Sequence, residues 1–98
     1  MMADSAEYLA LRRAEEAAEG HRQACRLLIE DIRRALPEAE RRMAWTPAGA
    51  GALQKAEKAV AKVEETLDRA DADTLEKHRA VLERVRSMLE KVLAQPQA

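Results

Sequence analysis

Residues 60–82 read VAKVEETLDRADADTLEKHRAVL, and they specify two helices joined by a short turn. Apolar residues recur at steps of three and four on both sides of residues 71–73, which places them on one stripe of each helix. So short a connection makes the two helices antiparallel neighbours. We therefore expect helices over about residues 47–70 and 74–94.

The starts of these two helices carry capping signals. Asp73 followed by Glu76 predicts a capping box at the start of the later helix. Thr46 before Pro47 predicts an N-cap with proline at the first helical position, where its missing N–H costs nothing. Two glycines in the next turn weaken it, so a later start near Ala52 remains an alternative.

The chain before this hairpin predicts a third, longer helix over about residues 5–36. Its apolar stripe also follows steps of three and four. The stripe consists of Leu11, Ala14, Ala18, His21, Cys25, Leu28, Ile32 and Ala35. Pro37 disfavours helical geometry at Leu36 and removes one backbone hydrogen bond. The helix therefore either stops there or bends and continues to Met43.

Composition agrees with an all-helical domain. Ala, Glu, Lys, Leu and Arg make up 62 of the 98 residues, while Phe is absent and there are only three Gly. Sandwiches, barrels and doubly wound sheets need more β-branched and aromatic residues and more glycine turns. We predict a single all-α domain over residues 1–98. It is a three-helix up-down-up bundle with a long first helix bent or broken at Pro37.

Charge and cysteine content narrow the function classes. The net charge is −1, and neither half of the chain has the basic excess that drives phosphate binding. Cys25 is the only cysteine, so no disulfide forms within the chain. No apolar stretch approaches the roughly 20 residues needed to cross a bilayer. We expect a cytoplasmic protein that does not associate with membranes.

The first helix is too long for its two partners. At 1.5 Å per residue it exceeds the last helix by roughly 16 Å, or by about 28 Å if it reaches Met43. Its N-terminal turns then project beyond the bundle with an apolar stripe that water does not favour. The candidate interaction residues on these turns are Tyr8, Leu9, Leu11, Ala14 and Ala18. The expected partner is a second copy, giving a homodimer, or another helical protein.

Trp45 is the one large aromatic residue outside the three stripes. It either packs on the first turn of the helix that follows or anchors a partner, as tryptophans do at interface hot spots. We include Trp45 among the candidate interaction residues.

Two alternative functions remain open at this stage. His21, Cys25 and His78 converge in some registers of the bundle and would suit zinc. The arginine pairs at residues 12–13, 33–34 and 41–42 would suit nucleic acid, although acids interrupt every pair. Because no nucleophile is activated and no phosphate loop exists, we expect no enzyme, no catalytic residue, no metal and no cofactor. The favoured function is a non-catalytic interaction module, an adaptor or small regulator.

Overall fold

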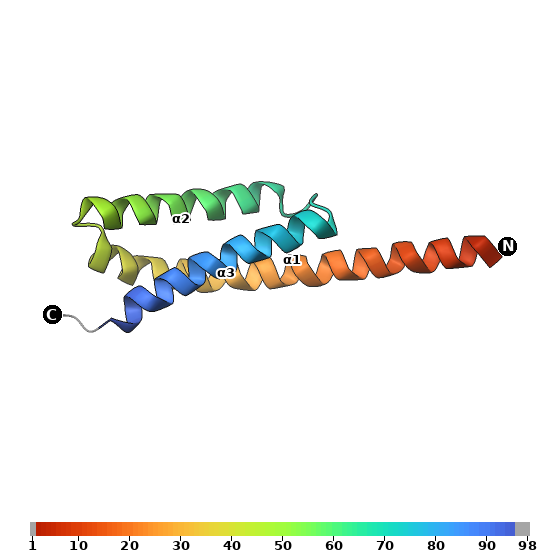
Figure 1. Ribbon diagram of the computed structural model, residues 1–98, viewed down its shortest axis with the longest axis horizontal. Coiled ribbons are helices and arrows are strands. Elements are labelled where there is room, and N and C mark those ends of the chain that lie inside the picture. Colours follow the sequence, from red (N-terminus) through yellow and green to blue (C-terminus); the bar gives the residue numbers. More distant parts are fainter. Residues whose placement is uncertain (1, 96–98) are drawn as a thin grey trace.

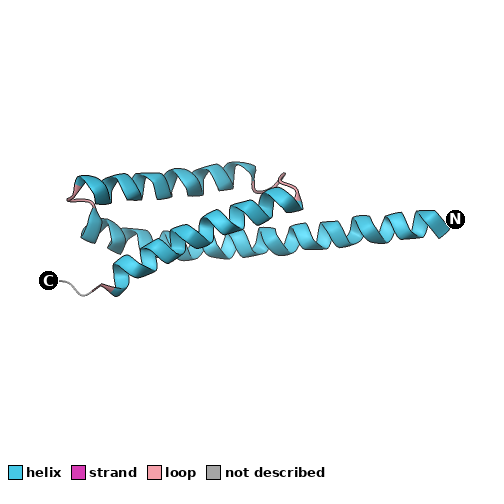
Figure 2. Ribbon diagram, viewed as in Figure 1, coloured by secondary structure: helices cyan, strands magenta, loops and turns pink. Residues whose placement is uncertain are grey.

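The computed structural model describes the backbone of residues 2–95 and the side chains of residues 6–95. It consists of α1 (Met2–Met43), α2 (Pro47–Thr66) and α3 (Ala72–Ala94), and these described residues contain no strand. α2 runs antiparallel to α1 and α3, which run parallel to each other (Figure 1, Figure 2). The predicted all-α, up-down-up three-helix bundle is confirmed.

At Pro37 the structure takes the second of the two alternatives, because α1 continues without interruption to Met43. Pro37 is exposed, and its nitrogen carries no hydrogen to donate to the carbonyl oxygen of Arg33, so one helical hydrogen bond is missing on the solvent side of α1. Ala39, which follows Pro37, is fully buried, and Leu36, which precedes it, packs against the core. Packing on both sides of the proline therefore keeps the helix intact where local preference opposes it.

The turn between α2 and α3 differs from the sequence expectation. α2 ends at Thr66 instead of residue 70, and α3 begins at Ala72 instead of residue 74. The N-cap is Asp71, whose side chain accepts a hydrogen bond of 2.9 Å from the Thr74 backbone N–H. The predicted cap at Asp73 is wrong, because Asp71 reaches the same kind of donor two residues earlier. Thr46 caps α2 as predicted, with the Gly49 N–H 3.0 Å from its Oγ1.

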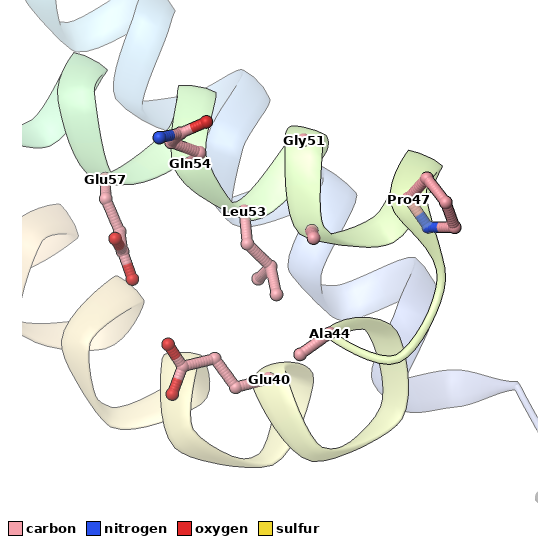
Figure 3. A pocket seen from close by; sticks show the side chains of 8 residues that line it. Glu40, Ala44, Pro47, Gly51, Leu53, Gln54 and Glu57 are labelled. Atoms are coloured by element: carbon pink, nitrogen blue, oxygen red, sulfur yellow. The ribbon is translucent and has the colours of Figure 1, made fainter.

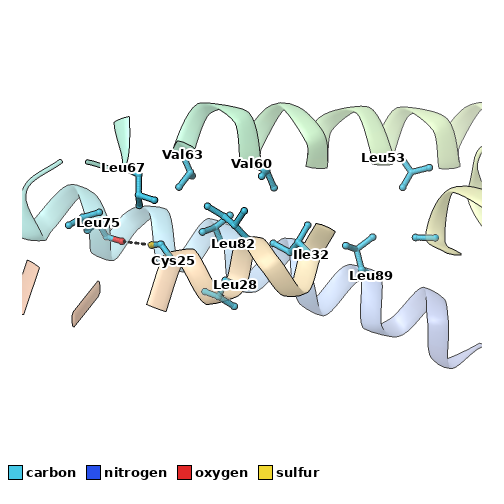
Figure 4. Close-up of a cluster of buried hydrophobic side chains, with 12 residues drawn as sticks. Cys25, Leu28, Ile32, Leu53, Val60, Val63, Leu67, Leu75, Leu82 and Leu89 are labelled. Atoms are coloured by element: carbon cyan, nitrogen blue, oxygen red, sulfur yellow. Dashed lines mark hydrogen bonds between the residues drawn. The ribbon is translucent and has the colours of Figure 1, made fainter. Parts of the chain in front are cut away.

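The core lies where all three helices overlap, and α1 packs more extensively against α3 than either packs against α2. α3 contributes three fully buried leucines spaced seven residues apart. Leu75, Leu82 and Leu89 face Cys25, Leu28 and Ile32 of α1 and Leu53, Val60, Val63 and Leu67 of α2 (Figure 4). The heptad spacing thus forms one continuous apolar core along the bundle.

The molecule is elongated, with principal extents of 68 × 22 × 16 Å. α1 has 42 residues and α3 has 23, which correspond to roughly 63 and 35 Å of helix. The N-terminal part of α1 therefore extends well past the α2–α3 turn (Figure 1). We name residues 2–20 of α1 the arm.

Candidate protein-interaction surface

Arg22 marks the base of the arm. Its Nε and Nη2 donate hydrogen bonds to the carbonyl oxygens of Leu67, at 3.0 Å, and Ala70, at 3.2 Å. Its Nη1 also lies 2.6 Å from a carboxylate oxygen of Glu19. These bonds attach the turn after α2 to α1 at residue 22. The arm begins where this attachment ends, so neither α2 nor α3 covers it along most of its length.

The arm carries the largest group of exposed apolar side chains on α1. Tyr8 is 62% exposed, Leu9 52% and Leu11 66%, and Ala14 is also exposed. Ala18 is half-buried and packs against the edge of the core. The core of the bundle therefore ends close to Ala18, while the apolar pattern continues toward the N-terminus.

The helical positions of these residues separate them into two faces. Leu11, Ala14 and Ala18 continue the stripe that is buried further along α1, and Tyr8 lies at its edge. Leu9 is two residues from Leu11, about 200° around the helix, and so lies on the opposite side. The predicted site residues on α1 thus form one face of four residues, which Leu9 does not join.

Trp45 lies in the connection between α1 and α2, at the end of the bundle opposite the arm (Figure 1). Its side chain is 79% exposed, and its indole Nε1 donates a hydrogen bond of 2.8 Å to the carbonyl oxygen of Arg42. So high an exposure leaves little of the side chain covered by α2, which does not favour the interpretation that Trp45 packs on the first turn of that helix. Trp45 and the arm cannot form a single continuous surface.

The three residues considered as zinc ligands have separate environments. Cys25 is fully buried, its thiol donates to the Leu75 carbonyl oxygen at 3.7 Å, and burial raises the pKa of that thiol. His78 Nε2 lies 2.8 Å from Thr66 Oγ1, and Nδ1 of His21 is buried without a hydrogen-bond partner. Across the part of the chain that the structure describes, no group of three or more His, Cys, Asp or Glu is placed to hold a metal ion.

The arginines of α1, apart from the exposed Arg13, contact carboxylates or backbone carbonyls of the protein itself. Arg33 pairs with Glu64 of α2, and Arg12 lies 3.5 Å from Glu16. Arg42 Nη1 donates to three carbonyl oxygens at the end of α3, at distances of 3.0 to 3.3 Å. Because these guanidinium groups already contact acceptors within the protein, they do not support a phosphate-binding surface. Sequence reasoning missed Arg22 and Arg42 as capping groups, although the exclusive use of Arg along α1 was a signal for planar, multidentate partners.

A shallow groove lies between the end of α1 and the start of α2 (Figure 3). Ala44, Pro47 and Leu53 line its apolar part, and the carboxylates of Glu40 and Glu57 point toward each other across it. These two carboxylates are not joined by a third metal-ligating side chain among the described residues. We therefore assign no metal site to this groove.

Two further results bear on the class of protein. No helix in the range 2–95 combines the length and the apolar character that crossing a membrane requires. Comparison of the chain with models of protein families, with curated proteins and with solved structures gives no match.

Proposed function

We propose that the protein is a non-catalytic interaction module, an adaptor or small regulator, that binds its partner through the arm. The observation that supports this function is the continuity of the arm's apolar face with the buried stripe of α1. The same stripe that α2 and α3 cover from Cys25 onward is exposed at Leu11 and Ala14. A helix with such a face is stabilised when another helix covers it.

Covering the arm with a partner helix should give a modest favourable free energy of association. Burying a large apolar side chain contributes roughly 1.5–3 kcal/mol, and Tyr8 and Leu11 begin more than half exposed. The alanines on the same face add little area, but they allow a partner helix to approach closely. The partner is a second copy of the chain or another helical protein, which pairs with the arm as in a coiled coil.

We place this activity in the cytoplasm. Cys25 is a buried free thiol, and a lone cysteine suits a reducing compartment, in which disulfides are rare. We carry forward neither metal binding nor nucleic-acid binding, because the candidate ligands lie in separate environments and the arginines serve the fold.

Removal of residues 1–18 tests the function. Among the described residues the buried core begins at Cys25, and of the deleted residues only Ala18 packs against it, so we expect the shortened chain to remain folded with a nearly unchanged mid-point of urea unfolding. We expect it to lose assembly, measured as native mass, and to lose capture of partners by the tagged protein. A full-length Leu27→Gln variant is the control, because Leu27 is 53% exposed on the covered part of α1. Unchanged assembly together with unchanged capture would reject the proposed function.

A further inference from the structure

We propose that the arm pairs with the arm of a second copy, in antiparallel orientation, around a two-fold axis between residues 12 and 13. This inference rests on the proposed function and names its partner. Three independent features of the arm support it: the sizes of the facing side chains, the length of the arm, and the groups along its two edges.

The sizes of the facing side chains fit this arrangement. Toward the N-terminus the face continues to Glu7, so Leu11 and Ala18 hold one of the two core positions of a heptad, and Ala14 and Glu7 hold the other. Glu7 is the one charged residue among these four; it is exposed, and in the proposed register it lies opposite Ala18 of the other copy, where its flexible side chain carries the carboxylate outward to water. An antiparallel two-fold pair sets one kind of core position opposite the other. In the proposed register Leu11 of each copy lies opposite Ala14 of the other. A large exposed side chain thus meets a small exposed one on both sides of the axis.

Other registers also set one kind of core position opposite the other, but the length of the arm favours the register that pairs Leu11 with Ala14. This register has the following extent. It sets Met2 of one copy level with Gln23 of the other, so the pair ends where Arg22 fastens the α2–α3 turn. Sliding the copies together by one heptad sets Glu7 opposite Cys25, which α3 already covers completely. Sliding them apart by one heptad sets Leu11 opposite Glu7 and leaves Ala18 outside the pair.

The edges of the two arms also match. In an antiparallel pair each edge meets the same edge of the other copy. One edge holds Ala10 and Ala17, which permit close approach of the backbones. The other edge brings Tyr8, now 62% exposed, to within about 3 Å along the axis of Glu15 in the other copy, so the phenol can donate to that carboxylate. The guanidinium of Arg12 lies on this edge as well and adds a positive charge beside that carboxylate.

The small size of the surface determines the strength of the association. Two arms of 19 residues form an interface at the low end of the range for specific association. We therefore expect a reversible dimer, with a native mass that rises with concentration from 11.0 kDa toward twice that value. Sedimentation equilibrium of the intact protein measures this rise directly.

Disulfide mapping tests the orientation. Variants Ala10→Cys and Ala17→Cys are prepared separately and mixed under oxidising conditions, with Cys25 left in place because it is fully buried. Residues 10 and 17 of different copies lie about 3 Å apart along the axis of the antiparallel pair, whereas two copies of residue 17 lie about 14 Å apart. Disulfides need Cα atoms within about 7 Å. We expect the mixture to form the 10–17 link and Ala17→Cys alone to form none.

Leu11→Gln and Leu27→Gln provide the matched pair of substitutions. Leu11→Gln removes the large side chain at the centre of the proposed pair, so the variant should keep a mass of 11.0 kDa at every concentration. Leu27 is similarly exposed but lies beyond the arm, and Leu27→Gln should dimerise as the unchanged protein does. Dimerisation of Leu11→Gln, or a 17–17 link, would overturn the antiparallel pair.

The failure of this inference can be told apart from the failure of the proposed function. A protein that stays at 11.0 kDa throughout, and yet loses capture of another helical protein when residues 1–18 are removed, retains the function with a different partner. If the deletion changes neither the native mass nor the capture of partners, both the antiparallel pair and the proposed function are rejected.

Discussion

Nη1 of Arg42, near the end of α1, lies 3.0 Å from the carbonyl oxygen of Leu93, in the last turn of α3. The same nitrogen donates to the carbonyl oxygens of Val92 and Gln95. The last carbonyls of a helix have no partner within it, and the negative end of the helix dipole favours a cation there. Arg42 therefore caps α3 from another helix. Arg22 does the same at the end of α2 through Leu67 and Ala70.

This cap predicts that Arg42→Ala destabilises the bundle by about 1–2 kcal/mol, through the lost hydrogen bonds to the end of α3. The mid-point of urea unfolding measures the change. Arg41→Ala is the matched control, because Arg41 is mostly exposed and pairs only with Glu38, on its own helix. Its effect should stay within about 0.5 kcal/mol. Equal losses in the two variants would contradict the capping role.

Substitution by alanine should have opposite effects on stability at Gly49 and at Gly51. A Cβ at this position would overlap the carbonyl group of Met43, because α2 begins directly against the end of α1. We expect Gly49→Ala to cost more than about 1 kcal/mol, since the backbone of the connection must shift. Gly51 has no atom within 4 Å of such a Cβ, so Gly51→Ala should raise helix stability by about 0.5–1 kcal/mol. Thermal unfolding followed by circular dichroism compares the two, and a gain at both positions would refute the clash.

The fold could be predicted because its determinants are local and repeated. The heptad spacing of Leu75, Leu82 and Leu89 places three leucines on one stripe of α3, and all three are fully buried. The overhang of α1 followed from counting residues at a fixed rise of 1.5 Å. The leucine stripe of α3 and the overhang of α1 could both be predicted without knowledge of any contact between residues far apart in the sequence.

The features that could not be predicted depend on tertiary contacts. Continuation of α1 through Pro37 requires the packing of Ala39, which no local preference reveals. The choice of Asp71 over Asp73 as the cap depends on where the turn sits against Arg22. The face of the arm could be predicted from spacing, but Leu9 does not lie on it, because Leu9 is about 200° around the helix from Leu11. Trp45 is different, because its indole hydrogen bond joins residues only three apart in the chain.

Asp71 predicts how the hairpin responds to acid. Hydrogen bonds from the side chain and the backbone N–H of Thr74 lower the pKa of the Asp71 carboxyl below its ordinary value of 3.8. A lowered pKa in the folded state stabilises the protein above the unfolded pKa, and this contribution is lost as the pH falls through the folded pKa. We expect the start of α3 to lose stability below about pH 4. Asp71→Asn keeps a capping acceptor without a charge, so the part of the acid dependence due to residue 71 should disappear in urea unfolding measured between pH 7 and pH 3. An unchanged pH profile would show that the charge on Asp71 contributes nothing.

The two histidines should respond in opposite directions to the same substitution. Nδ1 of His21 is buried without a hydrogen-bond partner, whereas Nε2 of His78 lies 2.8 Å from Thr66 Oγ1. A buried polar atom without a partner costs roughly 1–3 kcal/mol, so His21→Leu should stabilise the bundle by about 1 kcal/mol. His78→Leu removes the hydrogen bond that joins α3 to Thr66 and leaves the Thr66 hydroxyl only its 3.4 Å bond to the Lys62 carbonyl oxygen, so it should destabilise the bundle by about 1 kcal/mol. The mid-point of urea unfolding of the two variants, compared with that of the unchanged protein, measures both effects. If both variants gained stability, apolar burial alone would account for the result, and the contact between His78 and Thr66 would have no energetic role.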